Sequence, residues 1–154
     1  MRLKDKIAIV TGASSDIGTA IVKRFVEEGA HVVLVGRRID ALKKTSSAIK
    51  NGDKQTVTIP CDITDEAQVI QTVDQVFDHY GRIDILVNNA ATINDPIHFH
   101  EMSDSAWTNL IDINMIGTFK MTKAVLSKML EKKGGSIINI GSISSERAIP
   151  KVHL

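Results

Sequence analysis

The chain has 154 residues, of which 43% are hydrophobic and 24% are charged, a mixture typical of one globular domain rather than of a disordered chain. Its 19 basic and 18 acidic side chains give a formal net charge of +1, which excludes a strongly basic surface for nucleic acid or anionic membranes. A single cysteine excludes an internal disulfide, and no stretch approaches the ~20 apolar residues of a membrane span. We expect one domain over residues 1–154, cytoplasmic, with no nucleic-acid and no membrane partner.

Five short runs rich in Ile, Val and Leu predict β-strands, because they alternate with longer segments of helical periodicity. The predicted strands are residues 7–11, 31–35, 55–59, 83–87 and 136–140. Two of these runs contain IAIV and VVLV, which are apolar on both faces and therefore typical of a parallel sheet covered by helices on both sides. The predicted fold class is α/β, with a doubly wound parallel sheet.

Apolar residues at helical spacing predict four helices, at residues 17–29, 39–50, 65–80 and 103–131. Gly29 fits a C-terminal stop for the first helix, and Asp65 suits the N-terminal dipole of the third. Either Ser103 or Asp104 is expected to cap the fourth. Residues 91–102 form the only long loop that the pattern predicts.

Small and polar residues follow each predicted strand. These segments are TGASSDIG at 11–18, GRR at 36–38, CDI at 61–63, NNAA at 88–91 and GSISS at 141–145. Because ligands bind beyond the carboxyl ends of the strands in such a sheet, all five segments should lie on one binding rim.

The first of these segments is a glycine-bearing turn between a strand and a helix. Gly12 would permit the tight turn, Gly18 would allow close packing of helix on strand, and the free amides at the helix start would face a pyrophosphate. A turn without any ligand is the alternative. The position after the first strand of an alternating pattern favours a nucleotide.

Three motifs together resemble the short-chain dehydrogenase/reductase family, classical type. TGASSDIG is similar to its cofactor loop TGxxxGxG, NNAA to its NNAG, and IINIGS to the strand that delivers its catalytic serine, in order from about Lys4 to Leu154. The resemblance implies a Rossmann-like sheet with five of a presumed seven strands present. It also implies hydride transfer between a nicotinamide cofactor and an alcohol or its ketone, aldehyde or 3-oxoacyl counterpart, and a homo-oligomer, either dimer or tetramer.

The cofactor-binding residues that we assign, in part from this resemblance, are Gly12, Ser14, Ser15, Asp16, Ile17, Gly18, Arg37, Arg38, Asp62, Ile63, Asn88 and Ala90. In the family pattern Asp62 would bond the adenine edge, while Asn88 and Ala90 would border the adenosine ribose. Asp62 could instead cap a turn, and Asn88 and its neighbour Asn89 could tie adjacent strands together.

Two residues are assigned to catalysis by the resemblance. Ser142 would hydrogen-bond the substrate oxygen, and it is preferred over Ser144 and Ser145 because it follows the family's strand motif. Asn114 would hold a water of the proton relay. Asparagine is unfavourable inside a helix, so a kink or a role in the site would explain its position.

The residues after the second strand bear on the choice of cofactor. An NAD site places a carboxylate there, whereas this chain has Gly36, Arg37 and Arg38. Two guanidinium groups suit a 2′-phosphate, although a solvated pair at a helix start is the alternative. Because each cation opposes the helix dipole by ~0.3–1 kcal/mol, a bound phosphate would relieve that cost. The sequence favours NADP(H), with Arg37 the more important arginine.

Asp16 departs from the family pattern, since a glycine is usual there. A carboxylate 4 Å from a phosphate charge would repel it by ~1 kcal/mol in water and by ~4 kcal/mol at an effective dielectric constant of 20. Alternatively, Asp16 caps the first helix and points away, which we favour.

The family's catalytic tyrosine, thirteen residues after the serine, would fall at position 155, one residue past Leu154. Its lysine would come four residues later. The only tyrosine, Tyr80, lies in a structural segment and cannot replace it. We therefore expect the sequence to omit the C-terminal part of a longer protein, and the fragment alone to be inactive. A non-catalytic nucleotide-binding module is the alternative.

The remaining candidates carry weaker signals. His98 and His100 are metal-ligand types, but their spacing matches no strong pattern, so no metal site is predicted. Cys61 is expected to be a small buried hydrophobic residue. Trp107 and Phe119 are expected in the core or in a subunit contact.

Overall fold

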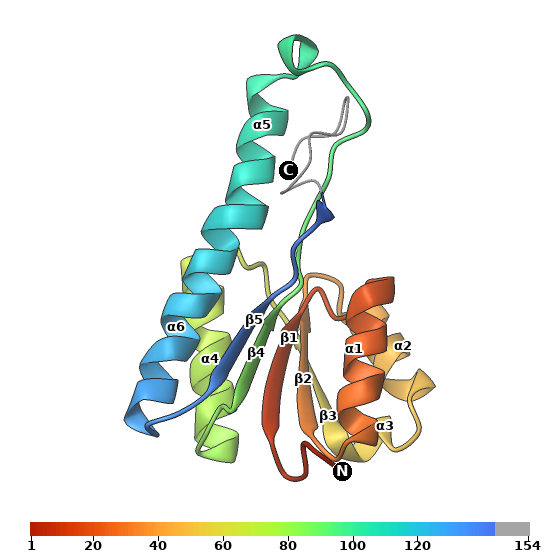
Figure 1. Ribbon diagram of the computed structural model, residues 1–154, viewed down its shortest axis with the longest axis vertical. Coiled ribbons are helices and arrows are strands. Elements are labelled where there is room, and N and C mark those ends of the chain that lie inside the picture. Colours follow the sequence, from red (N-terminus) through yellow and green to blue (C-terminus); the bar gives the residue numbers. More distant parts are fainter. Residues whose placement is uncertain (144–154) are drawn as a thin grey trace.

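A computed structural model describes residues 1–143 with the exception of the Asp53 side chain, and residues 144–154 lie outside the described part. All five strands belong to one parallel sheet, in the order β3-β2-β1-β4-β5 (Figure 1). The strands are β1 (Ile7–Thr11), β2 (His31–Gly36), β3 (Thr56–Pro60), β4 (Ile85–Asn88) and β5 (Ser136–Asn139). The α/β class and the doubly wound sheet are thereby confirmed.

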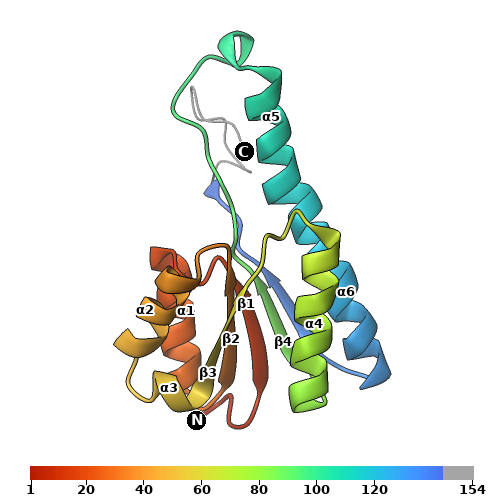
Figure 2. The same cartoon turned by 180° about the vertical axis from the view of Figure 1, so that it is seen from behind.

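Helices cover both faces of the sheet. They are α1 (Asp16–Glu27), α2 (Ile39–Ala48), α3 (Gly52–Gln55), α4 (Glu66–Tyr80), the 3-10 turn η1 (Phe99–Glu101), α5 (Asp104–Ile111), the π-helical stretch η2 (Asp112–Gly117) and α6 (Thr118–Glu131). Helices α1 and α2 lie on one face, and α4 and α6 lie on the other (Figures 1 and 2).

The apolar runs of the strands explain this two-faced arrangement. Along β1, Ala8 and Val10 are buried with residues of α1 and α2, whereas Ile9 is buried with residues of α4 and α6. Each strand of this type must lose water on both sides to bury its side chains, which is why helices are needed on both faces. The result is a rigid sheet that holds the loops at its carboxyl edge.

The helix boundaries follow local capping. Asp65 is expected as the first residue of the third helix, but it precedes α4 as the N-cap, and its side chain accepts hydrogen bonds from the backbone amides of Ala67 and Gln68. Ser103, rather than Asp104, caps α5 by accepting from Ala106 N–H. Gly29 follows α1 with φ +89, a conformation that suits glycine as a helix stop.

Three local features differ from the sequence expectation. Residues 52–55 form the short helix α3, which follows Asn51 in a left-handed conformation. Strand β4 begins at Ile85, two residues later than expected, and the Asp84 carboxylate before it accepts a hydrogen bond from the backbone N–H of Ile7 at the start of β1. The single helix predicted over 103–131 is interrupted by η2 in its middle.

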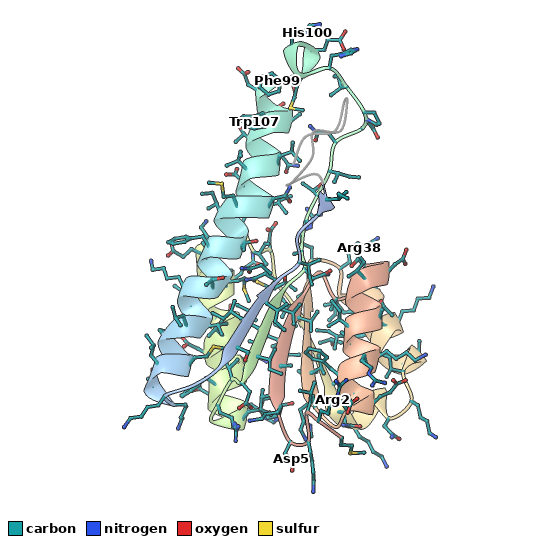
Figure 3. All side chains as sticks on the ribbon, in the orientation of Figure 1. Arg2, Asp5, Arg38, Phe99, His100 and Trp107 are labelled. Carbon is teal, nitrogen blue, oxygen red and sulfur yellow. The ribbon has the colours of Figure 1, made fainter. Side chains whose placement is uncertain are left out.

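Helix α5 and the loop before it project beyond the carboxyl edge of the sheet as an arm (Figures 1 and 2). Phe99 and Trp107 lie near the tip of this arm, with their rings edge to face at 5.7 Å (Figure 3). Trp107 is 40% exposed and Phe119 is 60% exposed, so neither belongs to the core of this chain. None of the helices in the described part of the chain is long and apolar enough to cross a membrane.

Candidate nucleotide-binding site

A cleft opens at the carboxyl edge of the sheet, where the segments after four of the strands meet. Its lining residues are Gly12, Ser14, Ser15, Gly36, Arg37, Arg38, Cys61, Asp62, Ile63, Asn89, Ala90, Ala91, Thr92 and Ile113. Eight of the predicted cofactor-binding residues are therefore brought together. The other four, Asp16, Ile17, Gly18 and Asn88, are absent from the lining.

Two glycines shape the turn between β1 and α1. Gly12 has φ +61, and a Cβ atom there would lie 2.8 Å from the Cα of Ala90. A Cβ atom on Gly18 would collide with the carbonyl oxygen of Gly12. Larger residues would force the turn and β4 apart, so both positions require glycine for close approach. This geometry leaves the start of α1 open at the rim, as a phosphate loop requires.

Ser15, rather than Asp16, caps helix α1. Its hydroxyl oxygen accepts from Gly18 N–H at 3.1 Å, and its hydroxyl donates to the carbonyl oxygen of Gly12 at 2.9 Å. Asp16 is the first helical residue and is exposed. The expectation that Asp16 caps the helix is therefore wrong, while its position outside the cleft lining agrees with a carboxylate that does not block the site.

Asn89 fastens the glycine-bearing turn between β1 and α1 to the end of β4. Its side-chain amide donates to the carbonyl oxygens of Thr11 and Gly12, each at 3.0 Å, and to the hydroxyl oxygen of Ser15 at 3.2 Å. The Thr11 hydroxyl oxygen in turn accepts from the backbone amides of Asn89 and Ala90. The assigned site residues omit Asn89, although the NNAA motif contains it.

Arg37 and Arg38 lie at the mouth of the cleft, between β2 and α2. Arg38 reaches the same end of the molecule as the start of α1 (Figure 3). Both side chains are exposed, and neither forms an ion pair with any side chain that the structure describes. Their guanidinium groups remain free to donate to an oxyanion.

The third wall of the cleft comes from the segment after β3. One carboxylate oxygen of Asp62 accepts from the Thr64 backbone amide at 3.0 Å and from the Thr64 hydroxyl at 2.8 Å, which is the turn that the alternative interpretation of this residue describes. Its other oxygen makes no hydrogen bond within the described residues. Cys61 is buried as expected, and burial raises the pKa of its thiol. This wall therefore carries the neutral thiol of Cys61 and the carboxylate of Asp62, of which one oxygen makes no hydrogen bond within the described residues.

Asn88 is buried away from the cleft. Its side-chain amide donates to Thr122 Oγ1 on α6 and to Asn139 Oδ1 on β5, each at 2.9 Å. The Asn88 side-chain oxygen has no partner within the described residues. Both N–H groups of the side-chain amide thus join β4 to α6 and β5. This agrees with the alternative that Asn88 ties neighbouring elements together instead of bordering the ribose.

Asn114 explains the interruption of the long helix. It lies within η2, and its side chain accepts from Thr92 N–H at 2.8 Å while it donates to Thr92 carbonyl oxygen at 2.9 Å. π-helical turns are rare and are frequent at functional sites. The turn also places Ile113 in the cleft wall beside Thr92. Asn114 itself does not line the cleft, but it holds a residue that does.

Ser142 follows β5 by three residues and is exposed. Its competitors Ser144 and Ser145 lie outside the described residues, as does the segment that leads to position 155. Strand β5 pairs with β4 from Ser136 to Asn139, so Ser142 emerges at the same edge of the sheet as the NNAA segment. It is not among the residues of the cleft lining.

His100 lies at the tip of the arm (Figure 3), and neither it nor His98 lines the cleft. The rings of His98 and His100 stack with centroids 5.6 Å apart. Among the side chains that the structure describes, no group of three or more His, Cys, Asp or Glu is arranged to hold a metal ion.

Comparison with known proteins shows which family this chain is similar to. The model of the short chain dehydrogenase family matches residues 6–153. An uncharacterised oxidoreductase of Staphylococcus epidermidis is 35% identical over 93% of this chain and 60% of its own length. The 3-oxoacyl-[acyl-carrier-protein] reductase of Thermotoga maritima is 34% identical over 93% of this chain and 58% of its own length.

A solved structure of NAD⁺-bound xylitol dehydrogenase has a TM-score of 0.94 and 30% identity, over 98% of this chain and 58% of that one. The chain therefore spans about three fifths of the length of these three proteins. With the family model matching almost its whole length, the chain belongs to the short-chain dehydrogenase family.

Proposed function

We propose that this protein takes part in NADP(H)-dependent hydride transfer between an alcohol and its carbonyl counterpart. The observation that carries the proposal is the cleft itself, because Arg37 and Arg38 line it together with the glycine-bearing phosphate loop. A glycine stands at position 36, where an NAD site would place a carboxylate. The comparison with an NAD⁺-bound relative leaves both cofactors as candidates, and the two arginines favour NADP(H).

The residues of the cleft fit a dinucleotide in three places. The first-turn amides of α1, beside Gly12 and Ser15, would hold the pyrophosphate. The open oxygen of Asp62 would accept from the adenine amino group, and Arg37 would bind the 2′-phosphate. When bound, the nicotinamide ring would supply the hydride chemistry, which belongs to the cofactor rather than to the protein.

Two further residues support an enzyme rather than a binding module. Ser142 would donate a hydrogen bond to the substrate oxygen and polarise the carbonyl. Asn114 would fix the wall at Thr92 and support proton delivery. A module that only binds nucleotide requires neither Ser142 nor a proton relay, whereas the Asn114–Thr92 contact, which fixes the cleft wall, would serve nucleotide binding as well as catalysis.

The relatives suggest the chemical class of the substrate. One is named for reduction of a 3-oxoacyl group and another for dehydrogenation of xylitol, so both act at a carbon that carries a hydroxyl or carbonyl oxygen. For this chain we propose the same class, an alcohol and its ketone, aldehyde or 3-oxoacyl partner.

We also propose that the protein works as a homo-oligomer in the cytoplasm. Exposed apolar side chains follow one another along α5, η2 and α6: Trp107, Met115, Phe119, Leu126 and Leu130. Exposed apolar side chains in this number along one helical region favour burial against another chain. Cys61 is a free thiol, which agrees with a reducing compartment.

Turnover and binding must be measured separately to test the proposal. Binding of NADPH is measured by calorimetry, and NADPH consumption is then followed with a panel of ketones and aldehydes. If NADPH binds to protein as long as the relatives but no carbonyl compound is reduced, the result supports the alternative that the protein only binds nucleotide. If neither NADPH nor NADH binds, the proposed function is wrong.

A further inference from the structure

A second cleft lies at the opposite edge of the sheet, where β1, β4 and β5 begin. It has a volume of about 710 Å³ and is bordered by Lys6, Arg82, Asp84, Lys132, Gly134 and Gly135. The nucleotide cleft lies beyond the carboxyl ends of the same parallel strands, so the two clefts are separated by the length of the sheet. No function proposed above uses this amino-terminal edge.

Positive charge outweighs negative charge in this basal cleft. Asp84 is the only acidic residue in its lining, against the cations Lys6, Arg82 and Lys132. Both oxygens of the Asp84 carboxylate are already engaged. Oδ2 accepts from Ile7 N–H at 2.9 Å, while Oδ1 meets both Lys6 Nζ, at 3.4 Å, and the Arg82 guanidinium.

This arrangement leaves donors in excess. One carboxylate brings two cations to a single oxygen atom, so Lys6 and Arg82 are held close together against their mutual repulsion. A guanidinium has five N–H donors and an ammonium has three, and Asp84 Oδ1 can satisfy only a small part of them. The remaining donors are available to a second anion.

Lys132 contributes a third cation from the end of α6. It forms no ion pair with the described side chains, and its Nζ lies 5.6 Å from the centre of the Phe77 ring. The loop that follows it is open, since a Cβ atom on Gly134 would meet nothing within 4 Å. A ligand could therefore approach this side of the cleft without displacing protein atoms.

We propose that the basal cleft binds a phosphate group, either as a free phosphate or diphosphate or as part of a small phosphorylated compound. A phosphate accepts several charge-assisted hydrogen bonds at once, and the planar Arg82 fork suits two of its oxygens. Lys6 and Lys132 add point charges beside the fork. A diphosphate, with more charge and more acceptor oxygens than a monophosphate, should bind more tightly.

Backbone amide NMR shifts during titration test this proposal, with inorganic phosphate and with pyrophosphate as probes at constant ionic strength. We expect saturable shifts around Lys6, Arg82 and Gly134, with pyrophosphate at least threefold tighter than phosphate. Shifts at the phosphate loop of α1 report the nucleotide cleft and are fitted separately. Saturable shifts confined to that loop, or none at all, would overturn the basal site without affecting the proposed function.

Two variants and a matched control sharpen the result. Lys132→Gln removes a cation that supports no ion pair, so the fold should remain intact, and it should weaken pyrophosphate at the basal cleft at least threefold. Arg82→Gln should weaken it at least tenfold. Lys133→Gln removes a neighbouring exposed lysine outside the lining and should leave the affinity unchanged. Equal losses of pyrophosphate affinity for all three variants would show only a general attraction between charges and would contradict a specific phosphate site in the basal cleft.

Discussion

The side chain of Asn114 pairs with the backbone of Thr92 through two hydrogen bonds, one accepted at 2.8 Å and one donated at 2.9 Å. The pair joins the π-helical stretch to the loop after β4 and fixes a wall of the nucleotide cleft. A side chain that would weaken a regular helix is therefore used where the helix is not regular.

Asn114→Ala should lower the free energy of unfolding by about 1–3 kcal/mol, because both backbone groups of Thr92 lose their partners in a half-buried place. Urea unfolding followed by circular dichroism measures the change. Asn109→Ala is the control, since Asn109 is exposed on the same helix, and it should change stability by less than about 0.5 kcal/mol. Equal effects of the two variants would contradict a special role for the Asn114–Thr92 pair.

Arg37→Asp should weaken NADPH binding at least tenfold more than NADH binding, because a charge-assisted hydrogen bond contributes about 1.5–3 kcal/mol and only NADPH carries the 2′-phosphate. Calorimetric titration of both cofactors measures the ratio. Lys43→Gln removes an exposed cation of α2 that does not line the cleft, and it should leave the ratio unchanged. If Arg37→Asp weakens both cofactors equally, Arg37 does not select NADPH.

Asp16→Gly should change NADPH affinity by less than about threefold, because the carboxylate is exposed outside the cleft lining and Ser15 already caps α1. Through-space repulsion in water is then only about 1 kcal/mol or less. The NADPH affinities of the glycine variant and the natural chain are compared at low and at high salt, because high salt would screen a real repulsion. A gain of tenfold or more in the glycine variant would show that Asp16 obstructs the phosphate.

The glycine-bearing turn, the strands of the parallel sheet and the position of the arginine pair could be predicted because their signals are local: β-branched runs, spaced glycines, and charges next to a strand end. The triple contact of Asn89 with Thr11, Gly12 and Ser15 could not, because it joins residues more than seventy positions apart. For the same reason, nothing in the local pattern distinguishes a buried Asn88 from a cleft-lining Asn89.

The helix interruption was predictable only in part. The low helix propensity of asparagine indicated a kink or a site at Asn114. That the break takes the form of a π-turn depends on the partner Thr92, which lies in a loop of no regular pattern. The exposure of Trp107 and Phe119 likewise depends on which faces of the helix the sheet leaves uncovered.

Asp84 should make the stability pH-dependent. Burial opposes its ionisation, but hydrogen bonds from Arg82 and Ile7 N–H outweigh that cost, so the pKa of the carboxyl lies below its usual value. A lowered folded-state pKa means that stability is present at neutral pH and is lost as the pH falls below about 5. We expect Asp84→Asn to be less stable than the natural chain at pH 7, with the difference shrinking toward pH 3.

Urea unfolding between pH 3 and pH 7 measures this change. Asp78→Asn is the control, because Asp78 is an exposed carboxylate of α4 without an ion pair in the described part of the chain. It should follow the natural chain at every pH. A constant difference between Asp84→Asn and the natural chain would rule out titration of Asp84 as the cause.

Calorimetric titration of the folded protein with NADPH and with NADH tests most directly whether the cleft at the carboxyl edge holds a nicotinamide dinucleotide. The account predicts a saturable one-to-one uptake of NADPH, at least tenfold tighter than that of NADH. If neither NADPH nor NADH gives a heat of binding or competes with the other, in protein whose circular dichroism shows the α/β fold, the proposed dinucleotide site is wrong.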